Sequence, residues 1–126
     1  CIRDRCIGED QHEYSKGGTE KKIKHQLTEN LFPLQNLSNN ILIAYEPIYA
    51  IGSGIAVQNE HLEEVSLLVK DLVRENLGTD FTLIYGGSVT SESAKNLAKV
   101  EGIDGFLVGN ASLDPKEFAK IALSLE

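Results

Sequence analysis

The chain has 126 residues, 41% of them hydrophobic and 25% charged, and its formal net charge is −7 at pH 7. This size and composition indicate one globular domain without low-complexity or fibrous segments. The acidic balance, with Lys21, Lys22 and Lys24 as the only basic cluster, argues against a nucleic-acid partner. Because no apolar run approaches the roughly 20 residues of a membrane span, we expect no membrane partner and a cytoplasmic location.

The first nine residues form the weakest strand candidate. A barrel strand is buried on both faces and is therefore continuously apolar, whereas this segment carries Arg3, Asp4 and Arg5. The same charges make residues 1–5 too polar for a signal peptide.

The cysteines predict no metal site. Cys1 and Cys6 are the only two, and their spacing to His12 and His25 matches no standard zinc motif. A disulfide is not expected in this class of protein, so the sequence predicts two free thiols.

A polar loop and a helix are predicted next. Residues 11–18 contain a Gly-Gly pair and indicate a loop. Thr19 can cap a helix whose apolar positions recur every four residues, at Ile23, Leu27 and Leu31. Pro33 and the run Ser38-Asn39-Asn40 end this helix and lead into the next strand.

The central stretch places one carboxylate at the end of a buried strand. Residues 41–44 are apolar and mostly β-branched, and Glu46 follows them directly. Pro47 forbids further ladder hydrogen bonds, and Gly52-Ser53-Gly54 allows torsions that other residues avoid. The pattern indicates a carboxylate on a rigid strand tip, followed by a loop that moves as a unit and offers backbone N–H groups. An ordinary strand-to-helix connection with a solvated glutamate remains open on spacing alone.

Two further βα units follow. Gln58 or Asn59 caps a second helix that ends at Gly78, and its apolar stripe comprises Leu62, Val65, Leu68, Val69, Leu72 and Val73. A strand over 81–85 ends at Gly86-Gly87, and a short helix is predicted over 91–99, with Ala94, Leu97 and Ala98 facing inward.

The last unit has a strand over 105–108 that ends at Gly109. Asp114-Pro115-x-Glu117 is typical of a helix start, with a cap, proline at the first position and an acid at the third. The expected buried side of this helix comprises Phe118, Ile121, Ala122 and Leu125.

Strands alternating with helices predict an α/β fold with a parallel sheet. An open doubly wound sheet is the alternative, but no GxGxxG follows a strand. In βα barrels the active site forms at the carboxyl ends of the strands, and phosphate commonly binds near the last two. Two consecutive strands that end in glycine turns, behind a loop that also ends in Gly-x-Gly, favour phosphate binding.

Four segments in order carry a family resemblance: Cys6-Ile7-Gly8-Glu9, Tyr45-Glu46-Pro47-x-x-Ala50-Ile51-Gly52-x-Gly54, Tyr85-Gly86-Gly87-Ser88-Val89, and the stretch from Gly105 to Leu113. Together they closely resemble triosephosphate isomerase, from about Cys6 to the C-terminus. The resemblance implies the C-terminal half of a (βα)8 TIM barrel, about four βα units over residues 1–126 with an atypical start at 1–5. Another phosphate-binding barrel enzyme would require the Glu-Pro motif to be coincidental.

The resemblance also implies roles for individual residues. Glu46 would be the base that moves a proton between adjacent carbons of a triose phosphate through an enediolate, without a cofactor. The substrate phosphate would be bound by Gly52, Ser88, Gly109 and Asn110. A lid over 47–57 and its latch would involve Pro47, Ile51, Ser53, Gly54, Tyr85, Gly86 and Gly87, while Glu9 and Tyr49 would position the open lid.

Two positions depart from the family pattern. The family usually has tryptophan where Tyr49 stands, and tyrosine keeps an aromatic body with a polar tip. It commonly has glycine where Asn110 stands; asparagine tolerates left-handed torsions, so a backbone donor there would survive.

The larger departure concerns the family's catalytic lysine, its electrophilic histidine and a nearby asparagine, which lie on the first four βα units and have no counterpart here. His12 and His25 do not replace that histidine, because they lie in or just after the loop that follows Glu9. Loss of such an electrophile costs on the order of 10²–10³ in rate. We therefore expect little activity from this chain alone; the alternative is a non-catalytic fragment or a half-barrel assembly module that keeps a phosphate site.

The expected partners follow from the same half-barrel. Two open sheet edges and one open face favour pairing with another chain, either a second copy or a separate N-terminal half. A small phosphorylated sugar is the expected substrate.

Overall fold

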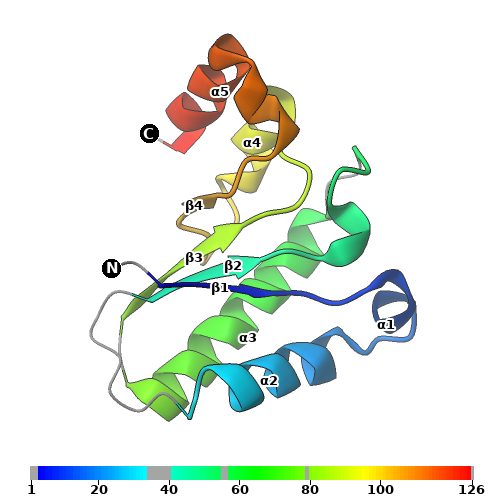
Figure 1. The fold of residues 1–126 in the computed structure, drawn as a ribbon, viewed down its shortest axis with the longest axis vertical. Coiled ribbons are helices and arrows are strands. Elements are labelled where there is room, and N and C mark those ends of the chain that lie inside the picture. Colours follow the sequence, from blue (N-terminus) through cyan, green and yellow to red (C-terminus); the bar gives the residue numbers. More distant parts are fainter. Residues whose placement is uncertain (1–2, 34–40, 55–56, 79, 126) are drawn as a thin grey trace.

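The computed structural model describes residues 3–33, 41–54, 57–78 and 80–125. Its centre is a four-stranded parallel sheet in the order β1-β2-β3-β4 (Figure 1). The strands are β1 (Arg3–Ile7), β2 (Ile41–Tyr45), β3 (Phe81–Tyr85) and β4 (Gly105–Phe106). Because spatial order follows chain order without reversal, the sheet has the arrangement of consecutive barrel strands and not that of an open doubly wound sheet.

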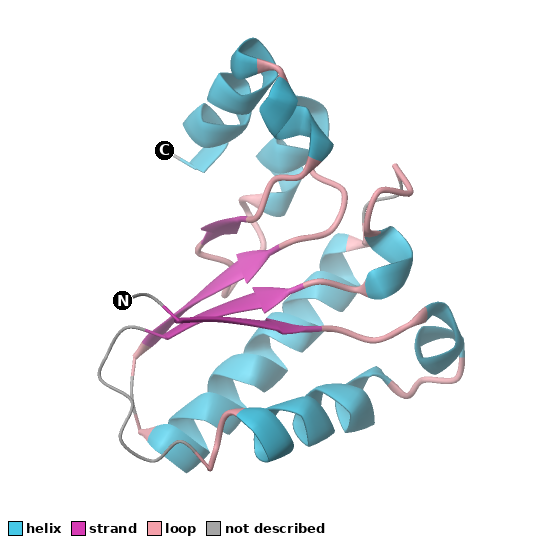
Figure 2. Cartoon of the chain, in the orientation of Figure 1, coloured by secondary structure: helices cyan, strands magenta, loops and turns pink. Residues whose placement is uncertain are grey.

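Helices follow each strand (Figure 2). They are α1 (Gln11–Ser15), α2 (Thr19–Asn30), α3 (Asn59–Leu77), α4 (Ser91–Leu97) and α5 (Pro115–Ala122), with 3-10 turns η1 (Ile48–Ala50), η2 (Asn110–Leu113) and η3 (Leu123–Leu125). In Figure 1, α2 and α3 run along one face of the sheet, and α4 and α5 lie together beyond β4. The result is a half-barrel.

The core lies between the sheet and helices α2 and α3. Successive strand side chains point to opposite faces. Ile43 and Leu83 are fully buried on the helix side, whereas their neighbours Leu42 and Ile84 are only half-buried on the other. The predicted stripe of the first helix, Ile23, Leu27 and Leu31, is buried as well. In the second helix Leu62, Val65, Val69 and Val73 are buried, and Leu68 and Leu72 are half-buried.

Local sequence signals at several helix ends are confirmed. Gly78 ends α3 with a left-handed φ of 57°. Asp114 caps α5 by accepting the N–H groups of Lys116 and Glu117, and Pro115 occupies the first turn. At the start of α3, Gln58 is the cap residue but makes no side-chain cap bond.

The predicted loop over 11–18 was wrong, because residues 11–15 form α1. Asp10 accepts the N–H of Glu13, and the Glu13 carboxylate accepts the N–H of Asp10, a reciprocal capping box that starts this short helix. The predicted cap at Thr19 was also wrong: Gly18 is the cap residue, and the Thr19 hydroxyl donates to the buried Glu9 carboxylate instead.

Three other boundaries differ. The first strand includes the charged residues 3–5, because its backbone pairs with β2 whatever its side chains are. The short helix ends at Leu97, and the last strand spans only residues 105–106. The expected buried side of α5 is mostly exposed: Ile121 is buried, but Phe118, Ala122 and Leu125 are exposed, since this helix packs chiefly against α4, η2 and η3. The predicted helix break at residues 38–40 lies outside the described residues.

Candidate active site

Glu46 follows the last residue of β2, and backbone bonds on both sides fix it there. Its N–H donates to the carbonyl of Ile7 at 2.7 Å, and the carbonyl of Tyr45 accepts the N–H of Gly86 at 2.8 Å. A Cβ added to Gly86 would lie 2.5 Å from Cγ of Glu46, so glycine leaves the room that the glutamate side chain occupies. The carboxylate therefore stands at the carboxyl edge of the sheet, where barrel enzymes place their active sites.

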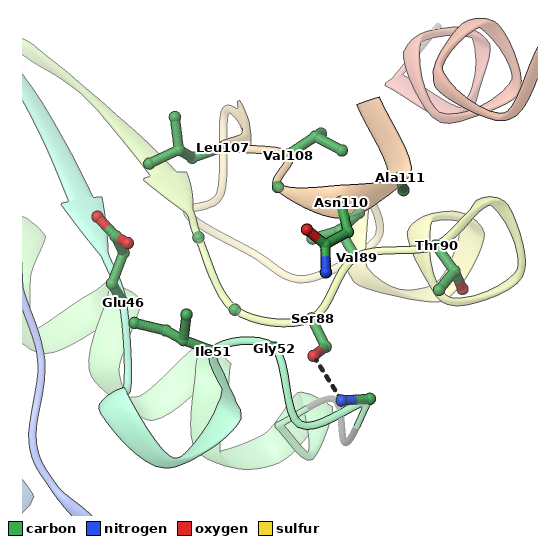
Figure 3. A pocket seen from close by; sticks show the side chains of 14 residues that line it. Glu46, Ile51, Gly52, Ser88, Val89, Thr90, Leu107, Val108, Asn110 and Ala111 are labelled. Atoms are coloured by element: carbon green, nitrogen blue, oxygen red, sulfur yellow. Dashed lines mark hydrogen bonds between the residues drawn. The ribbon is translucent and has the colours of Figure 1, made fainter. Parts of the chain in front are cut away.

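A cavity of about 380 Å³ opens at this edge. Figure 3 shows the Glu46 carboxylate on one side of it, and Ser88 and Asn110 on the other. Its wall comprises Glu46, Ile51, Gly52, Gly54, Gly86, Gly87, Ser88, Val89, Thr90, Leu107, Val108, Gly109, Asn110 and Ala111. The cavity thus joins the ends of β2, β3 and β4.

Two glycines, Gly52 and Gly109, bring backbone N–H groups to the cavity wall. Gly52 adopts a φ of 65°, in the left-handed region that favours glycine. Within the described part of the chain, the N–H groups of Gly52 and Gly109 have no backbone acceptor. Backbone N–H groups around a concave surface suit a phosphate or another anion when they point into it.

Ser88 joins the end of β3 to the lid, whose residues 47–54 and 57 are described. Its hydroxyl donates to the carbonyl of Ala50 at 2.7 Å and accepts the N–H of Gly54 at 3.1 Å (dashed line in Figure 3). The Tyr85 hydroxyl accepts the N–H of Val57 at 3.2 Å, and burial raises the pKa of this phenol. Three residues of the predicted lid, Ala50, Gly54 and Val57, are therefore bonded to the end of β3 or to the segment after it.

Cys6 is a titratable neighbour of Glu46. Its thiol, one strand away on β1, hydrogen-bonds to the Glu46 carboxylate. This bond, followed by partial burial and the negative charge of Glu46, raises the pKa of the thiol from 9.0 to about 11. The thiol is therefore protonated at neutral pH and acts as a donor to the candidate base.

Glu9 lies beneath the start of the lid and is fully buried. Its carboxylate accepts the hydroxyls of Tyr45 and Thr19, and its carbonyl accepts the N–H of Ile48. Among the described residues, the buried hydroxyl of Tyr49 has no hydrogen-bond partner and so does not bond to Glu9. Burial, and then the charge of Glu9, raise the pKa of both Tyr45 and Tyr49.

The structure gathers most of the predicted site residues in one place. The candidate base, the four predicted phosphate ligands, Ile51, Gly54, Gly86 and Gly87 all line the cavity. Pro47, Ser53, Tyr85, Glu9 and Tyr49 lie outside its wall, with Tyr85 and Glu9 bonded to parts of the lid.

One residue of this region was missed at the sequence level. His61, in the first turn of α3, approaches both Glu9 and Tyr45. It stands beside the apolar stripe of its helix, and its carboxylate partner is 52 positions away in the chain. Helical periodicity carries no signal for such a contact.

Comparison with protein families decides the assignment. The family model "Triosephosphate isomerase" matches residues 5–125, nearly the whole chain. This chain belongs to the triosephosphate isomerase family. The predicted family and TIM-barrel fold class are therefore confirmed, and the half-barrel described above is part of that barrel.

Curated triosephosphate isomerases cover almost all of the chain. The protein of Mesomycoplasma hyopneumoniae (strain 7448) is 42% identical over 121 residues, 94% of this chain and 47% of the relative. That of Aquifex aeolicus is 41% identical over 123 residues, 94% of this chain and 49% of the relative. The Neurospora crassa protein is 40% identical over 120 residues, which are 92% of this chain and 48% of the relative. The chain thus spans about half the length of the curated relatives it matches.

No group of three or more His, Cys, Asp and Glu side chains in residues 3–33, 41–54, 57–78 and 80–125 could hold a metal ion. No helix in these ranges is long and apolar enough to cross a membrane.

Proposed function

We propose that this chain carries the base, the lid and the phosphate site of a triosephosphate isomerase. Glu46 acts as the base, and backbone N–H groups of Gly52, Ser88, Gly109 and Asn110 bind the substrate phosphate. The substrate is dihydroxyacetone phosphate, interconverted with glyceraldehyde 3-phosphate. The observation that carries the proposal is the single cavity that these five residues line.

The chemistry required of Glu46 is a proton transfer. Its carboxylate takes a proton from the carbon next to the substrate carbonyl, the electron pair forms an enediolate, and the proton returns to the former carbonyl carbon. The hydroxyl proton of the substrate passes through water to the former carbonyl oxygen, so that the hydroxyl becomes the new carbonyl. The fixed backbone supports this role because a general base must be held within hydrogen-bond reach of the proton it moves. No cofactor is needed, since the protons balance within the substrate and the carboxylate.

The described residues place no histidine or lysine in the cavity wall. No described histidine or lysine of the cavity wall therefore neutralises the charge that develops on the substrate oxygen, and each missing donor of that kind costs on the order of 10²–10³ in rate. We accordingly propose slow proton abstraction and little net isomerisation by these residues alone.

Deuterium exchange tests the base without requiring full turnover. The purified chain is incubated with dihydroxyacetone phosphate in D₂O, and NMR follows loss of the proton on the carbon beside the carbonyl. We expect exchange above the uncatalysed rate, its loss in Glu46→Gln, and its retention in Glu64→Gln, an exposed residue of α3. Equal exchange in the wild type and Glu46→Gln would contradict the proposal.

Titration with inorganic phosphate tests the binding site separately. Shifts of the Gly52 and Gly109 amide signals are expected, with no shift for remote helix amides. Absence of both phosphate shifts and deuterium exchange would favour the alternative, a non-catalytic half-barrel assembly module.

The open sheet face supports that alternative. Leu42 and Ile84 are half-buried there, and Leu107 is 43% exposed beside the cavity. As an assembly module, the chain would pair this face with a separate N-terminal half or with a second copy. Light scattering distinguishes these cases: a dimer of this chain indicates the second copy, and a monomer that binds an added N-terminal half indicates the first.

A further inference from the structure

The Glu9 carboxylate is a charge buried under the segment that carries Glu46. Its side chain has no exposed surface, and it accepts the Tyr45 hydroxyl at 2.9 and 3.2 Å and the Thr19 hydroxyl at 3.2 Å. A buried carboxylate is strongly unfavourable unless it is paired and hydrogen-bonded. Its environment must therefore contain a compensating basic group.

His61 is that group among the described residues. Its Nε2 lies 3.2 Å from Oε1 of Glu9, and this is the one Glu9 ion pair within 4.0 Å that the described part of the chain contains. The same nitrogen is 3.2 Å from the Tyr45 hydroxyl oxygen. The Tyr45 hydroxyl donates its single proton to Glu9. An unprotonated Nε2 would therefore place its lone pair next to the lone pairs of the Glu9 carboxylate oxygen, which is repulsive. The geometry therefore requires the proton on Nε2, where it donates to Glu9.

The pair is enclosed by aromatic rings that continue to the lid. The His61 ring meets Tyr14 edge-on at a centroid distance of 4.9 Å, and Tyr14 stacks on Tyr49 at 4.7 Å. Tyr49 belongs to η1, the first turn of the lid. This enclosure limits water access to the His61–Glu9 contact and strengthens it electrostatically.

Glu9 in turn holds both sides of Glu46. Its carboxylate binds the hydroxyl of Tyr45, the residue before Glu46, and its carbonyl accepts the N–H of Ile48, two residues after it, at 2.9 Å. A shift of Glu9 therefore moves the carboxyl end of β2 and the start of the lid together.

We propose that His61 is a positioning residue for Glu46 and the lid, acting through Glu9. By donating a hydrogen bond from Nε2, His61 keeps the buried carboxylate in the orientation that accepts the Tyr45 hydroxyl. It thereby also keeps the Glu9 carbonyl in place to accept the N–H of Ile48. The inference rests on the proposed function only for its effect on proton transfer, because the structural effect is independent of turnover.

Amide hydrogen exchange in three variants tests the structural effect. His61→Leu removes the donor, His61→Gln restores a neutral donor at similar reach, and His25→Leu is a matched control on the exposed face of α2. In His61→Leu we expect the Ile48 amide to exchange about tenfold faster or more, the effect of losing a hydrogen bond to a charged group. The amide of Val69, buried in α3, serves as the reporter of global unfolding.

The pattern of these rates decides the proposal. Faster exchange at Ile48 with little change at Val69, recovery in His61→Gln and no effect of His25→Leu support it. Equal acceleration at both amides would show a general loss of stability, and unchanged Ile48 exchange would show that the lid does not depend on His61; either result overturns the proposal.

A measurement on the unmodified chain covers the case in which His61→Leu does not fold. The ¹⁵N chemical shifts of the His61 ring report which nitrogen carries the proton. A protonated Nε2 supports the assignment, and a proton on Nδ1 alone overturns it.

Catalysis gives a separate readout. If the Glu46-dependent deuterium exchange described above is detected, His61→Leu should lower it and His61→Gln should restore it; unchanged exchange in His61→Leu would contradict the positioning role. Absence of exchange in the wild type would contradict only the proposed function, because the amide and ring measurements need no substrate.

Discussion

Gly86 lies against the side chain of Glu46: a Cβ built on this glycine would be 2.5 Å from Cγ and 3.1 Å from Cδ of the glutamate. Gly86 follows β3 and Glu46 follows β2, so the contact joins neighbouring strand ends. The space for the candidate base is therefore created by a missing side chain on the next strand.

Gly86→Ala should displace the Glu46 side chain and destabilise the fold by about 1–3 kcal/mol, the usual effect of overpacking. Urea unfolding measures the loss of stability. Glu46→Ala removes Cγ and Cδ, the two atoms that would clash. The double variant should therefore lose less stability than the sum of the two single variants. Additive losses would show that the two residues do not interact.

The Cys6 thiol should react slowly with alkylating agents at neutral pH, because its hydrogen bond to Glu46 raises its pKa to about 11. Glu46→Gln removes the negative charge and should lower that pKa, so alkylation should accelerate. The rate of iodoacetamide labelling against pH, measured in a Cys1→Ser background, gives the apparent pKa. An unchanged profile in Glu46→Gln would contradict the contact.

The same shift links Cys6 to stability at high pH. The folded-state pKa is above the ordinary value of 9.0, so deprotonation is harder in the folded than in the unfolded chain. The contribution of the protonated Cys6 thiol to the stability of the fold is complete below pH 9, and it is lost as the pH rises toward 11. Unfolding midpoints of the wild type and Cys6→Ala should therefore differ in their slope within this window.

Ser88→Ala should loosen the lid. The substitution removes the bond to the Ala50 carbonyl and the bond from the Gly54 N–H, each worth about 1 kcal/mol. Faster exchange of the Gly54 amide is expected, together with a changed response of the cavity amides to phosphate. Ser15→Ala is the control, since the Ser15 hydroxyl donates to the carbonyl of His12 within its own helix. Equal effects of the two variants would argue against a lid role for Ser88.

Much of this architecture could be predicted from the sequence because its signals are local. The stripe of α3, the apolar run of β2 and the cap at Asp114 each depend on a few adjacent residues, and the structure has them in place. The candidate cavity followed from motif order, because parallel strands bring their carboxyl ends to one edge.

The failures also have physical causes. The polar residues and the Gly-Gly pair of 11–18 predicted a loop, and the capping box of Asp10 and Glu13, which starts α1, was missed. The prediction that Phe118 is buried assumed that other elements cover that side of α5, but the structure leaves this side chain exposed. The His61–Glu9 pair depends on how two elements pack, and no local pattern encodes that distance.

Contact between α4 and α5 should weaken in acid. The Glu117 carboxylate accepts the N–H of Ser91 at 2.7 Å, and this bond, with help from Lys120, holds the pKa of Glu117 below its ordinary 4.5. Because the folded pKa is depressed, the stabilisation is present above pH 4.5 and is lost as pH falls through the lower folded value. An acid titration of the Ser91 amide signal should therefore have its midpoint below 4.5.

Glu117→Gln separates this contact from general acid effects. The amide oxygen can still accept the Ser91 N–H but does not titrate, so the acid-dependent shift of the Ser91 signal should disappear. Glu75→Gln, on the exposed side of α3, should leave the titration unchanged. A Ser91 signal that titrates identically in Glu117→Gln and the wild type would assign the acid sensitivity to another carboxylate and remove Glu117 as the link between the two helices.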